Sequence, residues 1–225
     1  VVISKLEKLG QRVFRFDDDK FVAGELQIHF YTNQENIGFE MIYGDELINS
    51  QDIKSVWYRR PNFFNVQIKD PVQKKYAEDE IRIFLEGLWL TLSDVFWLSN
   101  PVSLESARKK ILQLRLAREV GFMVPETIVT NSPDKVKDFF SHCGGKIIFK
   151  AINQELLDYG DKSFGIPTTL ITEQHLEKID LVRRMPSLFQ EFIEKEYELR
   201  VTVVGNKVFS IKIDSQSNPI TAVDW

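Results

Sequence analysis

The hydrophobic pattern of the first hundred residues predicts alternating helices and strands. Residues 1–10 have the spacing of the second half of an amphipathic helix, which Gly10 ends. Alternating apolar positions predict strands over residues 12–16, 25–31 and 53–58. Apolar residues then recur every three or four positions from Ile81 to Phe96, which predicts a long helix. Asn100-Pro101 interrupts the pattern and is the first candidate domain boundary.

The rest of the chain is predicted to contain two helices and several short strands. One helix runs from about Ser103 to Gly121, and a second lies between the capping residue Ser132 and Gly144. Apolar runs predict strands over residues 146–150, 188–193, 199–204 and 208–213. A mobile loop is expected over residues 151–165. The order favours mixed α/β and α+β subdomains over one doubly wound sheet.

Composition narrows the class of protein. The 225 residues are 43% hydrophobic and include 17 Phe and 4 Trp, which supports a folded core and excludes a disordered chain. The net charge of −4 argues against nucleic acid as the main partner. Glu86 and Asp94 interrupt the most apolar stretch, which argues against a transmembrane helix and hence against a membrane partner. The single cysteine, Cys143, cannot form an internal disulfide and indicates the cytoplasm.

The sequence contains few familiar catalytic motifs. It has no phosphate-binding glycine loop and no pair of Cys-x-x-Cys motifs, and its three histidines are too scattered to predict a metal site. What remains is a set of lysines and carboxylates at the ends of apolar elements, namely Lys110, Lys150 and the segments 190–193 and 198–200. Taken singly, each has a simpler interpretation as a solvated surface group.

Together these segments resemble the ATP-grasp ligases. Residues 106–125, from Ser-Ala-Arg-Lys-Lys to Val-Pro, resemble the helix and turn that open the central subdomain of that family. Phe189-Gln-Glu-Phe-Ile193 resembles the adenine hinge, and Glu198 to Gly205 resembles the strand that contacts the ribose and phosphates. The resemblance implies an amino-terminal α/β domain (residues 1–100), a central lid subdomain (101–186) and the start of a carboxy-terminal antiparallel subdomain (187–225).

Within that family the chain is most similar to the microviridin-type (graspetide) peptide maturases. The similarity lies in four motifs: Trp-Tyr-Arg-Arg at 57–60, Gly-Asp-Lys at 160–162, Ser-Gln at 215–216 and Asp-Trp at 224–225. If residues 57–60 form a strand, Arg59 and Arg60 point to opposite faces, so only one of them reaches a cleft. The alternative is a structural corner with Trp57 in the core and both arginines in water.

The resemblance implies three groups of site residues. The nucleotide would be held by the cations Lys110 and Lys150, by the hinge Gln190, Glu191, Phe192 and Ile193, and by Glu198 at the ribose. Arg200 would be catalytic, lying over the γ-phosphate or the acyl phosphate made from it. Arg59, Arg60 and Lys162 would contact the peptide substrate.

The implied function is ATP-dependent carboxylate ligation through an acyl phosphate, which forms ester or amide crosslinks in a ribosomally made precursor peptide. The resemblance also suggests a homodimer. Two alternatives stay open: an amino-acid or glutamate ligase acting on a protein tail, and a non-catalytic nucleotide- or peptide-binding module.

The chain departs from the family pattern at its ends. Compared with that pattern, we expect the first strand of the amino-terminal domain to lie outside the given residues, and no Asp followed by Glu-x-Asn occurs after Arg200. We therefore expect the chain to be truncated at both ends and the Mg²⁺ ligands to lie outside it. The 225 residues alone should bind nucleotide weakly and turn over no ATP, because metal assistance is worth several kcal/mol.

Overall fold

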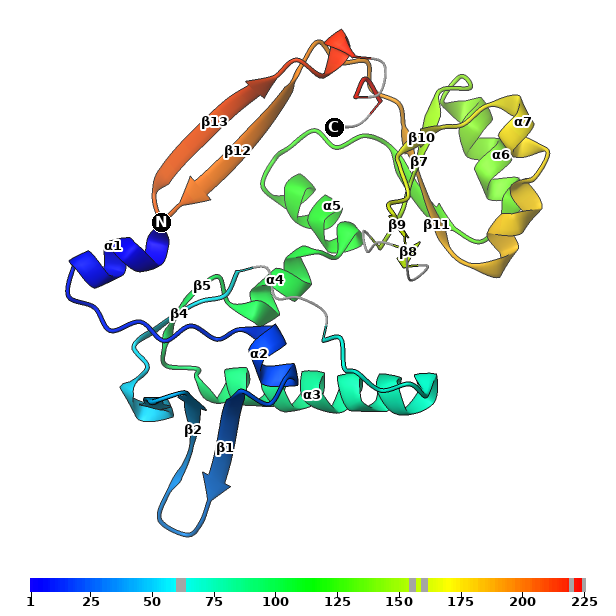
Figure 1. Cartoon of the computed structure of the whole chain (residues 1–225). Helices are drawn as coiled ribbons and strands as arrows, with labels where there is room; N and C mark the ends of the chain where they lie inside the picture. Colours follow the sequence, from blue (N-terminus) through cyan, green and yellow to red (C-terminus); the bar gives the residue numbers. More distant parts are fainter. Residues whose placement is uncertain (60–63, 154–156, 159–161, 219–220, 224–225) are drawn as a thin grey trace. The chain divides into compact units, whose positions relative to one another are not determined.

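The computed structural model describes residues 1–59, 64–153, 157–158, 162–218 and 221–223, and the chain divides into two units, residues 1–107 and 108–225 (Figure 1). Both units combine helices with sheets, as the sequence pattern predicts. No helix in the described ranges is long and apolar enough to cross a membrane.

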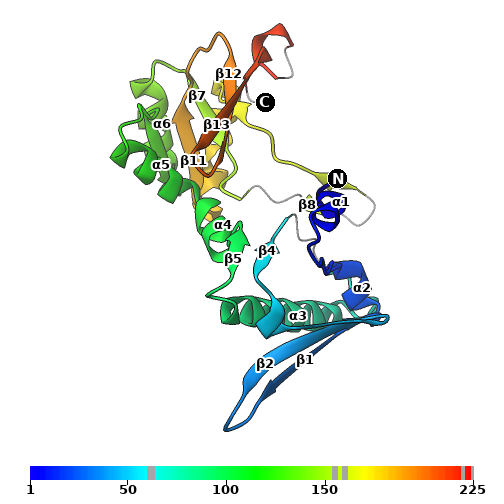
Figure 2. The ribbon, with the colours of Figure 1, turned by 90° about the vertical axis from the view of Figure 1, so that its left-hand side faces the viewer.

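A three-stranded antiparallel sheet forms part of unit 1. Its strands are β1 (Leu26–Thr32), β2 (Ile37–Tyr43) and β3 (Glu46–Asn49), in that order. The alternation in residues 25–31 correctly predicts β1. At the first turn, Asn33 Oδ1 accepts hydrogen bonds from the amides of Glu35 and Asn36. The β1–β2 hairpin extends past the long helix of this unit in both ribbon views (Figures 1 and 2).

That helix is α3 (Pro71–Thr91). Asp70 caps it by accepting from the amides of Val72 and Gln73 at 3.0 and 2.8 Å, and Pro71 occupies the first turn. The predicted continuation to Phe96 is wrong: Ser93 and Asp94 follow the end of the helix, and both residue types favour turns. Phe96 instead begins β5 (Phe96–Leu98), which pairs in parallel with β4 (Ser55–Trp57).

The core of unit 1 lies between its sheet and α3. Its buried residues are Phe39, Met41, Leu85, Leu88 and Leu92. Two short helices, α1 (Val2–Lys8) and α2 (Asp18–Val22), precede the sheet, and a short 3-10 turn, η1 (Ser50–Asp52), follows it. The strand predicted over residues 12–16 does not form. Phe14 and Phe16 pack against the core from irregular backbone instead, so burial accounts for the apolar pattern.

The helix predicted from Ser103 to Gly121 is two helices. α4 (Pro101–Ala107) and α5 (Lys110–Glu119) are separated at Arg108 and Lys109, where the Lys109 backbone is extended with ψ 103°. Arg108 and Lys109 occupy this break and Lys110 follows directly, and cations are unfavourable at a helix amino terminus. The break places Lys110 at the first turn of α5.

A four-stranded antiparallel sheet forms the centre of unit 2. Its strands, in spatial order, are β10 (Thr169–Leu170), β7 (Ile147–Lys150), β11 (Ser187–Glu191) and β6 (Thr127–Thr130). The helix α6 (Pro133–His142) and the 3-10 segment η2 (Ile179–Arg184) pack on one face, with Phe189 in their core. Because side chains alternate along β11, Leu188 and Gln190 face the opposite side.

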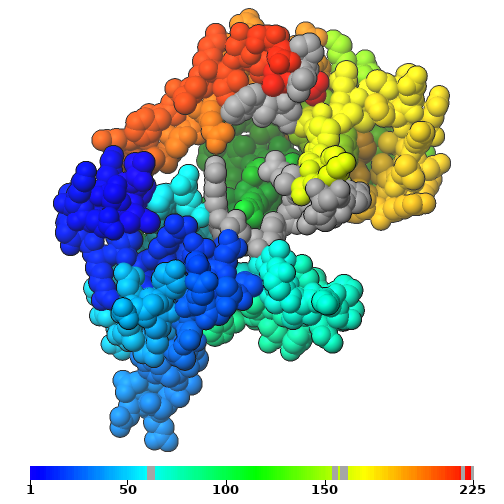
Figure 3. Space-filling view, in the orientation of Figure 1, coloured from blue at the N-terminus to red at the C-terminus, as the bar shows by residue number. Residues whose placement is uncertain are grey.

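The remaining elements of unit 2 are small. They are the helix α7 (Glu173–Leu176), the 3-10 turn η3 (Ser215–Ser217), and the hairpins β8 (Leu157–Asp158) with β9 (Ser163–Phe164) and β12 (Glu198–Val204) with β13 (Lys207–Ile213). The predicted loop over 151–165 thus contains paired strands. The β12–β13 hairpin turns at Gly205, with φ 58°, and projects as an arm from the rest of its unit (Figure 3).

Candidate functional site

A cavity of about 650 Å³ lies in unit 2, against the sheet face that α6 leaves uncovered. Side chains of α5, the ends of β7 and β11, and the segment before β10 line it. The lining residues are Lys110, Gln113, Leu114, Ala117, Lys150, Ala151, Asn153, Gly165, Ile166, Pro167, Thr168, Leu188, Gln190 and Val223. Three of the residues proposed from the sequence, Lys110, Lys150 and Gln190, therefore meet in one cavity.

The charge of this cavity is positive. Two lysines line it, and the described lining residues include no carboxylate. Lys110 Nζ donates a hydrogen bond to the carbonyl of Ala151, the residue that follows β7. This hydrogen bond connects α5 to the sheet. Lys150 is half-buried, and its side chain forms no hydrogen bond or ion pair with any residue that the structure describes. A site with this charge favours an anionic ligand such as a phosphate chain.

Gln190 supplies the main polar group on the β11 side of the cavity. Its side chain is only 8% exposed, and its Nε2 donates to Thr127 Oγ1 at 2.9 Å. Gln190 and Thr127 are register partners on β11 and β6, so their side chains share one face of the sheet. Thr127 was missed by sequence reasoning, because 63 residues separate it from Gln190 and no local pattern connects them.

The backbone at the end of β11 is only partly available to a ligand. The Glu191 amide donates to the carbonyl of Glu126 at 2.9 Å, and the Phe192 amide donates to that of Lys146 at 3.0 Å. No residue in the described part of the chain accepts from the Ile193 amide. Among these three amides, only that of Ile193 is therefore open to a base.

Glu198 does not line the cavity but is connected to its edge. Lys195 Nζ lies 2.5 Å from Glu198 Oε1 and 3.1 Å from the carbonyl of Val223, which is a lining residue. Glu198 Oε2 is buried and has no hydrogen-bond partner among the described residues. An unpartnered buried carboxylate oxygen can accept from a ligand hydroxyl. Lys195 escaped the sequence analysis, although its spacing of three from Glu198 is a detectable signal.

The other sequence candidates lie outside the cavity lining. Arg200, on β12, and Lys162, before β9, are both exposed. Arg59 belongs to unit 1, where its guanidinium lies 5.3 Å from the centre of the Trp57 ring. Trp57 is 45% exposed, so the alternative that buries it in the core is wrong. Arg60, like residues 160–161 and 224–225, lies outside the described residues.

The described residues do not fit a metal ion: nowhere among them do three His, Cys, Asp or Glu side chains form a group that could hold one. Cys143 does not fit a nucleophile either. Burial, followed by the charges of Glu126 and Glu191, raises the pKa of its thiol above the ordinary 9.0. Glu126 also contacts His142 Nε2 at 2.9 Å. We assign no chemical step to these groups.

Comparison with known proteins connects this site to a family. Residues 1–105 match the family model described as the MvdD pre-ATP grasp domain. The structure of macrocyclase MdnC bound with precursor peptide MdnA, from Microcystis aeruginosa MRC, is 31% identical, with a TM-score of 0.87; the match covers 96% of this chain and 71% of that one. The chain belongs to the ATP-grasp ligase family. Its members are enzymes, and the family resemblance seen in the sequence is confirmed.

Two further relatives extend this comparison within the ATP-grasp ligases. A RiPP-associated ATP-grasp ligase from Chryseobacterium gregarium, in complex with ADP and a leader and core peptide, is 29% identical over 98% of this chain and 66% of that one, with a TM-score of 0.87. A protein named probable alpha-L-glutamate ligase, from Enterobacter sp. (strain 638), is 29% identical over 116 residues. That match spans 49% of this chain and 37% of the length of the relative.

Proposed function

We propose that the intact protein is an ATP-dependent ligase that forms side-chain ester or amide crosslinks in a ribosomally synthesised precursor peptide. The observation that carries the proposal is the cavity of unit 2. It combines Lys110 and Lys150, no carboxylate among its described lining residues, and the polar side chain of Gln190. Macrocyclase MdnC, which is similar over most of its length, is described as bound with a precursor peptide.

Three of the proposed nucleotide contacts use a group that has no partner among the described residues: Lys150 Nζ, the Ile193 amide and Glu198 Oε2. Lys150 Nζ, which has no described partner, would neutralise a phosphate, and Lys110 would join it from α5. The Ile193 amide would donate to a ring nitrogen of adenine. Glu198 Oε2, buried and unpartnered, would accept from a ribose hydroxyl. Arg200 is proposed to act at the γ-phosphate.

ATP supplies the phosphoryl group that activates the carboxylate. In the proposed reaction, a carboxylate oxygen of the peptide attacks the γ-phosphorus and ADP leaves. A hydroxyl or amine of the same peptide then attacks the acyl carbon, phosphate leaves, and the nucleophile loses a proton. The chain contributes positioning and positive charge through Lys110, Lys150 and Arg200. Mg²⁺ belongs to this proposal as a general partner of ATP, with no ligand assigned among the described residues.

Arg59, Arg60 and Lys162 are proposed to contact acidic positions of the precursor peptide. The Arg59 guanidinium contacts the Trp57 ring as a cation–π pair, which does not use its N–H hydrogen-bond donors, and these donors match carboxylates. A homodimer and a cytoplasmic location remain predictions from the sequence.

A glutamate ligase is the second candidate, because the Enterobacter relative carries that name and matches half of this chain. One experiment separates the candidates: the intact protein is incubated with ATP, glutamate and a candidate precursor, and ADP and peptide mass are measured. Crosslinking removes one water per ring and forms one ADP. Ligation of glutamate adds glutamyl mass instead. If no ADP forms with any acceptor while ATP still binds, the protein is a binding module and the ligase proposal fails.

A further inference from the structure

We infer that Thr127 determines the base preference of the nucleotide site, because it fixes the orientation of the Gln190 carboxamide. This inference rests on the proposed binding of ATP. Thr127 is a positioning residue: it does not line the cavity and acts only through Gln190, which does.

Three hydrogen-bonding groups define the orientation. Thr127 Oγ1 donates its single hydrogen to the carbonyl of Pro125 at 2.9 Å. A carbonyl oxygen only accepts, so that hydrogen is committed. Thr127 Oγ1 can therefore only accept from Gln190, and the Gln190 group that faces it at 2.9 Å must be the amino group. Exchanging the nitrogen and oxygen of the carboxamide would place two acceptors against each other.

This orientation commits one hydrogen of Gln190 Nε2 to Thr127 and leaves Gln190 Oε1 without a hydrogen-bond partner among the described residues. Gln190 is 8% exposed and lines the cavity, so a base in that cavity meets an oriented hydrogen-bond acceptor. An acceptor favours the 6-amino group of adenine and disfavours the 6-carbonyl group of hypoxanthine or guanine. Buried polar groups reject the wrong partner strongly, because both groups then lose their hydrogen bonds.

The matched substitutions are Thr127→Val and Thr127→Ser in the intact protein. Valine keeps the branched shape and removes the hydroxyl, so the carboxamide can turn and offer its amino group to a carbonyl. Serine keeps the hydroxyl. Calorimetry gives the dissociation constants of ATP and inosine triphosphate, which differ at position 6 of the base, and thermal unfolding checks that each variant is folded.

We expect wild type and Thr127→Ser to prefer ATP over inosine triphosphate by about tenfold or more, and Thr127→Val to lose about tenfold of that preference. A Gln190→Met background tests the coupling: there, Thr127→Val should change the ratio no further. If Thr127→Val retains the wild-type ratio, or if wild type binds both nucleotides equally, the inference is overturned while ATP binding stands. If wild type binds neither nucleotide, the proposed function fails first.

Discussion

Lys195 pairs with only one of the two carboxylate oxygens of Glu198. Its Nζ lies 2.5 Å from Oε1, whereas Oε2 is buried and has no partner among the described residues. Because Lys195 also donates to the carbonyl of Val223, the pair fixes Glu198 at the edge of the cavity. A carboxylate held in this way keeps one oxygen for a ligand, and an unsatisfied buried acceptor costs about 1–3 kcal/mol until a donor arrives.

Glu198→Gln should weaken ATP binding about tenfold, because an amide accepts fewer hydrogen bonds and loses the charge that strengthens them. Binding of a dideoxy analogue of ATP, which lacks both ribose hydroxyls, should change much less. Titration calorimetry measures both ligands. Glu196→Gln, two residues earlier and exposed, is the matched control. Equal losses for the two ligands would show that Glu198 acts on the fold and not on the ribose.

Lys150→Met should lower ATP affinity by about tenfold to a hundredfold, since a hydrogen bond to a charged group is worth roughly 1.5–3 kcal/mol. Adenosine, which lacks phosphates, should bind the variant nearly as well as it binds wild type. Lys146→Met is the matched control. Lys146 lies just before β7, is exposed, and pairs with Glu194 at 2.7 Å. An equal loss of adenosine and ATP affinity in Lys150→Met would remove Lys150 from the phosphate site.

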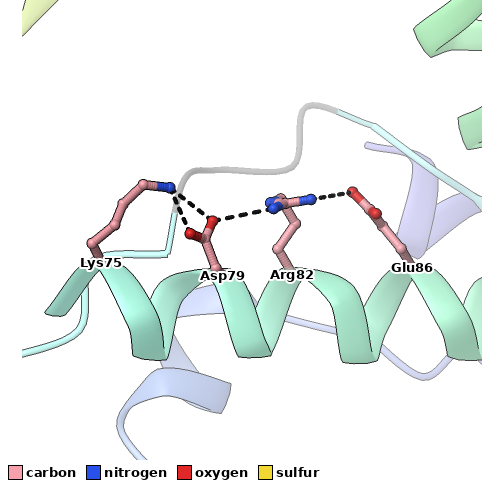
Figure 4. Close-up of polar contacts among 4 residues, drawn as sticks. All are labelled: Lys75, Asp79, Arg82 and Glu86. Atoms are coloured by element: carbon pink, nitrogen blue, oxygen red, sulfur yellow. Dashed lines mark hydrogen bonds and ion pairs between the residues drawn. The ribbon is translucent and has the colours of Figure 1, made fainter. Parts of the chain in front are cut away.

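The exposed side of α3 carries a chain of ion pairs whose pH dependence can be measured (Figure 4). Lys75 Nζ lies 2.8 Å from Asp79 Oδ1, and a guanidinium nitrogen of Arg82 lies 3.1 Å from the same oxygen. The other terminal nitrogen of Arg82 lies 3.5 Å from Glu86 Oε1. Hydrogen bonds from Lys75, then from Arg82, lower the pKa of Asp79 below its ordinary 3.8.

A carboxyl group with a lowered pKa stabilises the fold above its ordinary pKa and loses that contribution as the pH falls through the lowered value. The stability difference between wild type and Asp79→Asn should therefore shrink as the solution is acidified below about pH 4. Thermal unfolding at several pH values measures it, with Glu80→Gln as an exposed control. In Lys75→Met, the Asp79 pKa measured by NMR should rise toward 3.8; an unchanged value would mean that Lys75 does not act on it.

Local signals in the sequence were sufficient for elements that depend on local chemistry. Ser132 followed by proline predicts α6, and the structure caps that helix with Ser132 Oγ. Gly205-Asn206 predicts the turn of the β12–β13 hairpin. Predictions failed where a tertiary contact decided the outcome. Phe14 and Phe16 show strand periodicity, but they pack on the core without a partner strand.

The candidate site was predictable only in part, because some of its residues join it through tertiary contacts. Lys110, Lys150 and Gln190 were found through the resemblance to the ATP-grasp ligases, and they line one cavity. Thr127 and Val223 join the site through contacts between residues far apart in sequence, which no local pattern encodes. The hinge motif identified the segment, but only the sheet registry shows that the amides of Glu191 and Phe192 are already occupied.

The sheet register predicts different effects for proline at positions 192 and 193, although the sequence alone predicts the same effect for both. Phe192→Pro removes the amide that donates to the Lys146 carbonyl, so it should destabilise the junction of β11 and β7. Ile193→Pro removes an amide without a described acceptor, so it should spare the sheet and remove the donor proposed for adenine. We expect Ile193→Pro to lower ATP affinity at least about tenfold while its melting temperature stays near that of Ile193→Ala.

The control for this pair is a ligand without a base. Inorganic triphosphate should bind Ile193→Pro and wild type equally, because its contacts are with Lys110 and Lys150. Glu191→Ala should retain most ATP affinity, since the backbone, and not this side chain, is expected to contact the base. If Ile193→Pro binds ATP as wild type does, the base lies elsewhere in the cavity and Gln190 becomes the only hinge residue that contacts it.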